Sequence, residues 1–201
     1  MAITIEYYFS PMSPWTYLGH ERFAALARKY GAAIDVMPVD FGKIFPASGG
    51  LPLAKRAPQR QRYRLVELAR WREVLGLPLT LQPRYFPYDT TLASLLLVAA
   101  KGRDGQAAAL RLAGALLHAT WAEERDMGDE AQLAAVAAEQ GFDTPSLLQL
   151  AKSAATRAEY ERLTQAAIGR DVFGAPTYVL DGELFWGQDR LDLLERKLAR
   201  S

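Results

Sequence analysis

The sequence contains no cysteine and only two histidines, His20 and His118. The absence of cysteine excludes disulfides, thiolate metal sites and a thiol nucleophile supplied by the protein itself. Two histidines are too few for most metal centres, so we expect no bound metal. His20 falls within an expected helix and is interpreted as a structural residue, and no role is assigned to His118.

An excess of charge of one sign is also absent, because 24 Lys and Arg residues are balanced by 23 Asp and Glu residues. A net charge of +1 favours neither nucleic acid nor an anionic membrane as a partner, and it points to a small-molecule substrate. The longest apolar stretch, residues 92–100, is too short to span a bilayer, and no basic segment followed by an apolar one marks the N-terminus. We therefore expect a soluble, cytoplasmic protein.

Hydrophobic residues occupy 50% of the 201 positions, which is enough for one domain or for a small domain that carries an insertion. The β-rich run at residues 3–9 predicts a strand, and helical spacing follows over residues 15–30. Residues 33–41 predict a second strand, in which Pro38 indicates an edge or a bulge. Residues 42–58 are rich in turn formers and predict a loop.

Helical patterns dominate the middle of the chain. They predict helices at residues 60–75, 90–101, 106–124, 130–139 and 145–168, with Asp129 and Thr144 as caps of the last two. Residues 77–89 hold three prolines and predict no regular element. Strands return only at residues 177–180 and 183–186, which Asp181 and Gly182 join as a hairpin, and a final helix is expected at residues 189–199.

This order of elements predicts an α/β fold, a thioredoxin-like sheet (β-α-β … β-β-α) with a large all-helical insertion. We expect residues 1–45 and 170–201 to form the thioredoxin-like domain. Residues 46–169 are then the helical insertion domain with its connecting loops.

The turn between the first strand and the first helix has the sequence S-P-M-S-P-W-T-Y-L-G at residues 10–19. Ser13 and Pro14 fit the N-cap and the first helical position. The free N–H groups of a helix start, above the carboxyl end of a strand, offer a site for an anion. Two interpretations are open at this point, because Ser13 is either only a cap or the centre of a binding site.

Two motifs resemble those of a known family: S-P-W-T-Y-L-G after the first strand and V-F-G-A-P-T-Y-V-L-D-G-E-L-F-W-G-Q-D-R near the C-terminus. They are similar to motifs of the 2-hydroxychromene-2-carboxylate isomerases, relatives of kappa-class glutathione transferases on the DsbA-type thioredoxin fold. The likeness covers essentially the whole chain, including W-A-E-E-R-D-M at residues 121–127. It implies glutathione as the cofactor and a homodimer as the assembly.

The resemblance implies a catalytic role for Ser13. In this family a serine occupies the helix start that holds a redox cysteine in disulfide oxidoreductases, and glutathione supplies the thiol. A serine hydroxyl that donates to the glutathione sulfur stabilises the thiolate, and the positive end of the helix adds to this. Ser10 is the competing serine, and alignment on the T-Y-L-G that follows favours Ser13.

The resemblance also implies where glutathione binds. Ala175 and Pro176 match a cis-proline loop, in which the residue before the proline pairs with the cysteinyl backbone like an added strand. Gln188 and Asp189 match the segment that holds the γ-glutamyl end, where Asp189 pairs with the α-amino group. The alternatives are an ordinary trans proline and a simple helix cap.

One departure from the family lies in the loop after the second strand, where relatives have an asparagine and this chain has S-G-G-L at residues 48–51. In the family, a basic residue near the start of the next helix meets the glycyl carboxylate or the acid group of the substrate. Lys55, Arg56, Arg60 and Arg62 are the candidates, and Arg60 is ranked first. The alternative is a solvated charged face.

The four tryptophans divide into two pairs. Trp71 and Trp121 lie in expected helices and are interpreted as core residues. Trp15 and Trp186 flank the expected site in the sequence, so they are candidates for the wall of an aromatic pocket.

The resulting hypothesis is a glutathione-dependent isomerase of 2-hydroxychromene-2-carboxylate-like aromatic keto-acids, acting in aromatic hydrocarbon catabolism. Reversible addition of the thiolate would convert a double bond into a single bond, and rotation and elimination would then give the trans product. The alternatives are a kappa-like glutathione transferase or peroxidase, and a non-catalytic thioredoxin-fold binding module.

Overall fold

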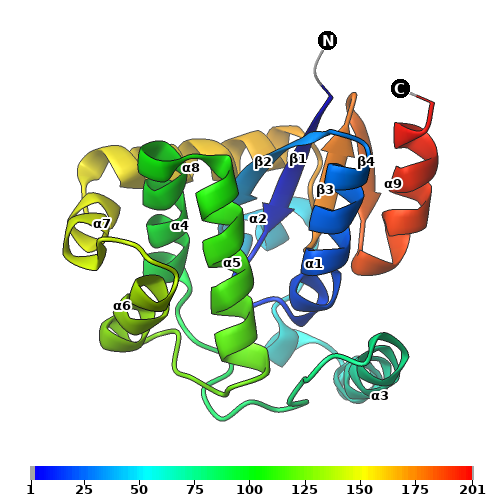
Figure 1. The fold of residues 1–201 in the computed structure, drawn as a ribbon. Helices are drawn as coiled ribbons and strands as arrows, with labels where there is room; N and C mark the ends of the chain where they lie inside the picture. Colours follow the sequence, from blue (N-terminus) through cyan, green and yellow to red (C-terminus); the bar gives the residue numbers. More distant parts are fainter. Residues whose placement is uncertain (1–2, 201) are drawn as a thin grey trace.

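The computed structural model describes residues 3–200, and its sheet contains four strands within that range (Figure 1). β1 runs parallel to β2 and antiparallel to β3, and β3 and β4 form the predicted hairpin. The α/β architecture is therefore the predicted one. In spatial order the strands are β2 (Ala33–Pro38), β1 (Thr4–Phe9), β3 (Thr177–Leu180) and β4 (Glu183–Trp186).

The register of β1 with its two neighbours brings distant parts of the chain to one edge of the sheet. Phe9 pairs with Pro38, and Tyr8 pairs with Thr177. The carboxyl end of β1 therefore lies beside the start of β3. The turn that follows β1 and the loop that precedes β3 meet at this edge.

β2 is an edge strand, as Pro38 indicates, but it ends earlier than predicted. The prediction of a loop at residues 42–58 is wrong for its first part, because Phe41–Ser48 form helix α2. Asp40 caps this helix by accepting a hydrogen bond from the Gly42 N–H at 2.8 Å. The cap and the apolar side chains of the helix outweigh the turn-forming residues that begin at its C-terminal end.

The middle of the chain is helical, as predicted, with two corrections. The helix predicted at residues 145–168 is divided in two, because Ser153 caps its second part by accepting from the Thr156 N–H at 3.2 Å. The N-cap position of the first part is Asp143, not Thr144, and its side chain makes no capping hydrogen bond. These two parts are α7 (Thr144–Ala151) and α8 (Ala154–Gly169). The remaining helices of the described residues are α1 (Pro14–Lys29), α3 (Pro58–Leu75), α4 (Thr91–Asp104), α5 (Gln106–Trp121), α6 (Glu130–Glu139) and α9 (Leu191–Leu198), with 3-10 turns η1 (Leu53–Lys55) and η2 (Gln188–Arg190).

Aromatic rings form the centre of the core behind this edge of the sheet. Tyr7 of β1 stacks on Phe9 with ring centroids 4.6 Å apart, and on Tyr178 of β3 at 5.5 Å. Phe23 of α1 packs against both tyrosines. Burial of each such ring contributes on the order of 2 kcal/mol to stability. The cluster therefore fixes α1, β1 and β3 relative to one another, and with them the turns at their ends.

Helices α4, α5, α7 and α8 pack on one another to one side of the sheet, and α4, α5 and α8 also contact β2 (Figure 1). Helix α3 lies at one end of the molecule, next to α1. Within residues 3–200, no helix has both the length and the apolar character needed to cross a membrane. The division into domains at residues 1–45 with 170–201 and at residues 46–169 stays a prediction.

Candidate active site

Ser13 is the N-cap of α1, as predicted. Its backbone is extended (φ −77°, ψ 122°), and its Oγ accepts a hydrogen bond from the Thr16 N–H at 3.2 Å. Pro14, which has no N–H, occupies the first helical position. Tyr88 holds the turn in place, because its hydroxyl donates to the Pro11 carbonyl at 3.2 Å. The positive end of the α1 dipole is therefore directed at the sheet edge where β1 ends.

Among the described residues, the Ser13 hydroxyl has only a weak hydrogen-bond acceptor. It points to the Ala175 carbonyl oxygen at 3.5 Å, well beyond the usual 2.5 to 3.0 Å (roughly) of a hydroxyl hydrogen bond. The hydroxyl can therefore donate to a ligand atom that comes closer. The competing Ser10 also lines the cavity, where its Oγ accepts from the Met12 N–H at 3.3 Å.

The loop before β3 presents open backbone groups beside Ser13. The Ala175–Pro176 peptide bond is cis, as the sequence favours. The Pro176 carbonyl accepts from the Gly187 N–H at 2.9 Å, which joins this loop to the start of η2. Among the described residues, the Ala175 N–H has no hydrogen-bond partner, and its carbonyl meets only the distant Ser13 hydroxyl. An extended ligand can pair with both groups, as a strand does.

A cavity of about 210 Å³ opens next to Ser13, and its walls are largely aromatic. Phe173 and Trp186 meet edge to face with centroids 4.8 Å apart. Gly174 allows this arrangement, because a Cβ there would lie 2.2 Å from the Trp186 indole nitrogen. The aromatic residues of the wall are Trp15, Phe41, Phe45, Phe86, Phe173 and Trp186, so the two tryptophans predicted for the pocket do line it.

Two further hollows share Trp15, Arg56 and Trp186 with this cavity. One, of about 300 Å³, is lined by Glu67, Trp71 and the segment 187–190. The other, of about 850 Å³, lies along residues 48–51 and the start of α3. Trp121 is buried, as predicted, whereas Trp71 is only partly buried and lines the hollow of about 300 Å³. Together the hollows provide space for a ligand that extends to both sides of Ala175.

Gln188 and Asp189 border the smaller of these hollows but differ in what their side chains do. Gln188 is buried, and its Oε1 accepts from Arg22 Nη1 at 2.8 Å, so its side chain attaches η2 to α1. Asp189 is exposed and pairs with Arg190 at 2.7 Å. Of these two side chains, the exposed Asp189 carboxylate is the one that can meet a cationic group of a ligand, in exchange for Arg190.

The structure separates the basic residues that the sequence groups together. Arg60 is exposed and lines the large hollow but not the Ser13 cavity. Arg56 lines both, and Lys55 and Arg62 line none of the three spaces. Arg64, which is not among the candidates from the sequence, lines the Ser13 cavity and also the large hollow. Its position four residues after Arg60, on the same face of α3, is the signal that could have identified it.

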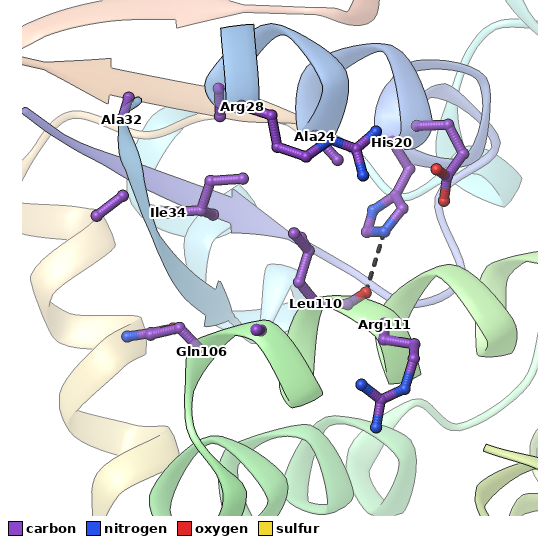
Figure 2. Close-up of a pocket in the computed structure, with 12 residues that line it drawn as sticks. His20, Ala24, Arg28, Ala32, Ile34, Gln106, Leu110 and Arg111 are labelled. Atoms are coloured by element: carbon purple, nitrogen blue, oxygen red, sulfur yellow. Dashed lines mark hydrogen bonds between the residues drawn. The ribbon is translucent and has the colours of Figure 1, made fainter. Parts of the chain in front are cut away.

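His20 has the structural role expected for it. Its ring lies between the Tyr7 hydroxyl and the Leu110 carbonyl oxygen, each 3.1 Å away. Figure 2 shows this histidine at the edge of a separate pocket of about 570 Å³ between α1, the start of β2 and α5. The pocket walls are mainly alanines and other apolar side chains, with Arg28 and Arg111 at the rim. This pocket shares no residue with the Ser13 cavity.

Comparison with known proteins agrees with the fold. The family model of the DSBA-like thioredoxin domain matches residues 4–199. A Sphingobium xenophagum protein named 2-hydroxychromene-2-carboxylate isomerase is 33% identical, over 98% of this chain and 99% of its own length. A solved structure of a 2-hydroxychromene-2-carboxylate isomerase has a TM-score of 0.83 at 30% identity, covering 98% of this chain and 95% of that one. Glutathione S-transferase kappa 2 of Caenorhabditis elegans is 26% identical, over 97% of this chain and 91% of its own length.

Proposed function

This chain belongs to the 2-hydroxychromene-2-carboxylate isomerase family within the DSBA-like thioredoxin domains, and we propose that it is a glutathione-dependent isomerase of aromatic keto-acids. The relatives named as isomerases support the isomerase role. The kappa-class relatives support glutathione as the cofactor. We propose substrates similar to 2-hydroxychromene-2-carboxylate, produced in aromatic hydrocarbon catabolism, and a cytoplasmic homodimer as the working form.

The observation that carries the proposal is the weakly engaged Ser13 hydroxyl at the start of α1, in a chain without cysteine. Bound glutathione would supply the thiolate that adds reversibly to a conjugated carbon of the substrate. The Ser13 hydroxyl donates a hydrogen bond to the sulfur, which favours the charged thiolate over the neutral thiol. The N-terminal end of α1 adds positive potential at the same place and lowers the thiol pKa further.

Other residues of the chain hold and orient the two molecules in this proposal. The open backbone groups of Ala175, before Pro176, pair with the cysteinyl part of glutathione. Asp189 binds the α-amino group, and Arg60 binds the glycyl carboxylate across the large hollow. Gln188 positions the segment that carries Asp189. The aromatic cavity takes the substrate ring and excludes water from it.

The test is product analysis with ring-opened 2-hydroxychromene-2-carboxylate and a known amount of reduced glutathione. We expect the isomerised acid to accumulate while the free thiol concentration stays constant, because an isomerase returns all its glutathione. Loss of thiol in proportion to product would instead establish a kappa-like transferase or peroxidase, the second candidate, which the kappa relatives favour. No glutathione binding at all would leave a binding module with the same fold.

A further inference from the structure

The cavity beside Ser13 contains a cation, Arg64, that has no anionic partner among residues 3–200. The Nη2 of Arg64 is buried and makes no hydrogen bond, and no salt bridge of the described residues includes Arg64. The guanidinium lies over two rings, 5.1 Å from the centroid of Phe86 and 5.7 Å from that of Trp121. Ring faces attract a cation, but they supply no hydrogen-bond acceptor in the plane of the guanidinium.

The described groups around Arg64 add positive charge and a further unpaired donor, and they supply no free carboxylate. Arg56 lines the same cavity and adds a second positive charge. Glu67, one turn further along α3, is already paired with Arg70 at 2.6 Å. The indole N–H of Trp121 is a second buried donor without a partner. Buried donors and charges normally have partners, so the surroundings of Arg64 lack an acceptor that carries negative charge.

The guanidinium remains charged at neutral pH. Burial, followed by the charge of Arg56, lowers the pKa of Arg64 to about 10. It therefore offers planar, paired N–H donors that match the two oxygens of a carboxylate.

The volume of the cavity and the residues of its walls indicate which kind of molecule bears the carboxylate. Its volume of about 210 Å³ is smaller than a pocket for a whole drug-sized molecule, so it suits one ring with a short side chain. Phe45 and Phe86 stand beside the two arginines, and Trp15 and Trp186 line the same space. Aromatic walls bind flat, unsaturated groups best.

We infer that Arg64 binds the carboxylate of a planar, unsaturated aromatic acid whose ring occupies the cavity beside Ser13. The inference rests on the proposed function in so far as this acid is the substrate. It gives the acid group of the substrate to Arg64, which lines both the cavity and the large hollow, and leaves Arg60, which lines only the large hollow, to glutathione. Arg64 would thus determine specificity for acids over neutral analogues of the same shape.

The experiment compares trans-cinnamate with cinnamamide, its uncharged analogue, by quenching of tryptophan fluorescence in the complete protein without glutathione. We expect cinnamamide to bind at least about tenfold more weakly than cinnamate, because hydrogen bonds to a charged partner are lost. Arg64→Gln should weaken cinnamate binding by a similar factor and leave cinnamamide binding unchanged. Arg62→Gln is the matched control, because Arg62 lies on the same helix but lines neither the cavity nor its neighbouring hollows.

Arg64→Lys serves as the second variant if Arg64→Gln fails to fold. It keeps the charge and most of the side chain but loses the paired donors, so we expect it to retain part of the preference for cinnamate. Glutathione affinity, measured by calorimetry, should be the same in wild type and in both variants.

Three results would overturn the assignment: equal binding of the two probes by the wild-type protein, an undiminished preference for cinnamate in the Arg64 variants, or a loss of glutathione affinity in those variants. Failure of the proposed function has a different result. If the protein binds no glutathione but prefers cinnamate through Arg64, the acid site stands and the isomerase mechanism does not.

Discussion

The hydroxyl oxygen of Ser13 lies 3.5 Å from the carbonyl oxygen of Ala175, although 162 positions separate the two residues in the sequence. The sheet produces this contact, because β1 ends where the antiparallel β3 begins. A hydroxyl donor at a helix start and an open backbone edge thus face each other. This is the arrangement expected of a site that holds an extended ligand with a sulfur or an anion at its centre.

Gly174 should be required for the shape of the cavity. In Gly174→Ala the new Cβ would lie 2.2 Å from the Trp186 indole nitrogen, so Trp186 must leave its position. We expect kcat/KM to fall by at least about tenfold, since even a small misplacement of groups in a site is costly. The matched control is Gly102→Ala in α4, where a Cβ meets nothing within 4 Å. That change should stabilise the protein by roughly 0.5 to 1 kcal/mol in thermal unfolding and leave kcat/KM unchanged.

Gln188 should act as a positioning residue for Asp189. Gln188→Ala removes the buried acceptor of Arg22, and we expect the free energy of unfolding to fall by about 1 to 3 kcal/mol. Glutathione affinity should fall as well, because η2 loses its attachment to α1. Arg190→Ala breaks only an exposed pair and should change stability by less than about 0.5 kcal/mol. Denaturant unfolding and calorimetry measure both effects, and equal losses in the two variants would contradict this role.

Stability should decrease as the pH falls below about 6.5 because of His20. Burial, partly offset by the charge of Glu21 and the Leu110 carbonyl, lowers the pKa of His20 below its ordinary value of 6.5. The unfolded chain therefore binds a proton at a pH where the folded protein does not. The resulting slope is up to about 1.4 kcal/mol per pH unit, from pH 6.5 down to the pKa of the folded state.

Denaturant unfolding between pH 7 and pH 5 (roughly the range in which histidine titrates) measures this slope. It should be smaller in His20→Gln than in the wild-type protein. An identical slope in wild type and His20→Gln would show that other groups cause the acid sensitivity.

Local signals in the sequence were sufficient for much of the fold. The Asp181-Gly182 turn located the hairpin, and Ser13 with Pro14 located the start of α1. The sequence does not reveal helix α2, because turn-forming residues begin at its C-terminal end, from Pro46 onward. The break before α8 was missed because Ser153 interrupts a segment with continuous helical propensity.

The sequence predicts the candidate site well where a contiguous motif forms it. It predicts the site less well where the packing of a helix determines which side chains line the cavity. Trp15, Trp186 and Ala175 lie at the cavity as expected. Among the arginines of α3 and its preceding loop, only the rotation and placement of the helix determine which side chains point inward. For this reason the sequence ranks Arg60 first for the glycyl carboxylate or the acid group of the substrate, whereas the position of Arg64 in the cavity follows only from the structure.

The most direct test follows the ionisation of glutathione bound to the protein by ultraviolet absorbance of the thiolate as the pH is varied. We predict that the bound thiol has a pKa below its value of about 8.5 in water, and that Ser13→Ala raises it. Ser153→Ala is the matched control, because it also removes an N-cap, with a loss of about 1 kcal/mol of stability, but lies far along the chain in α8. The same pKa in Ser13→Ala as in wild type would contradict the central role of Ser13.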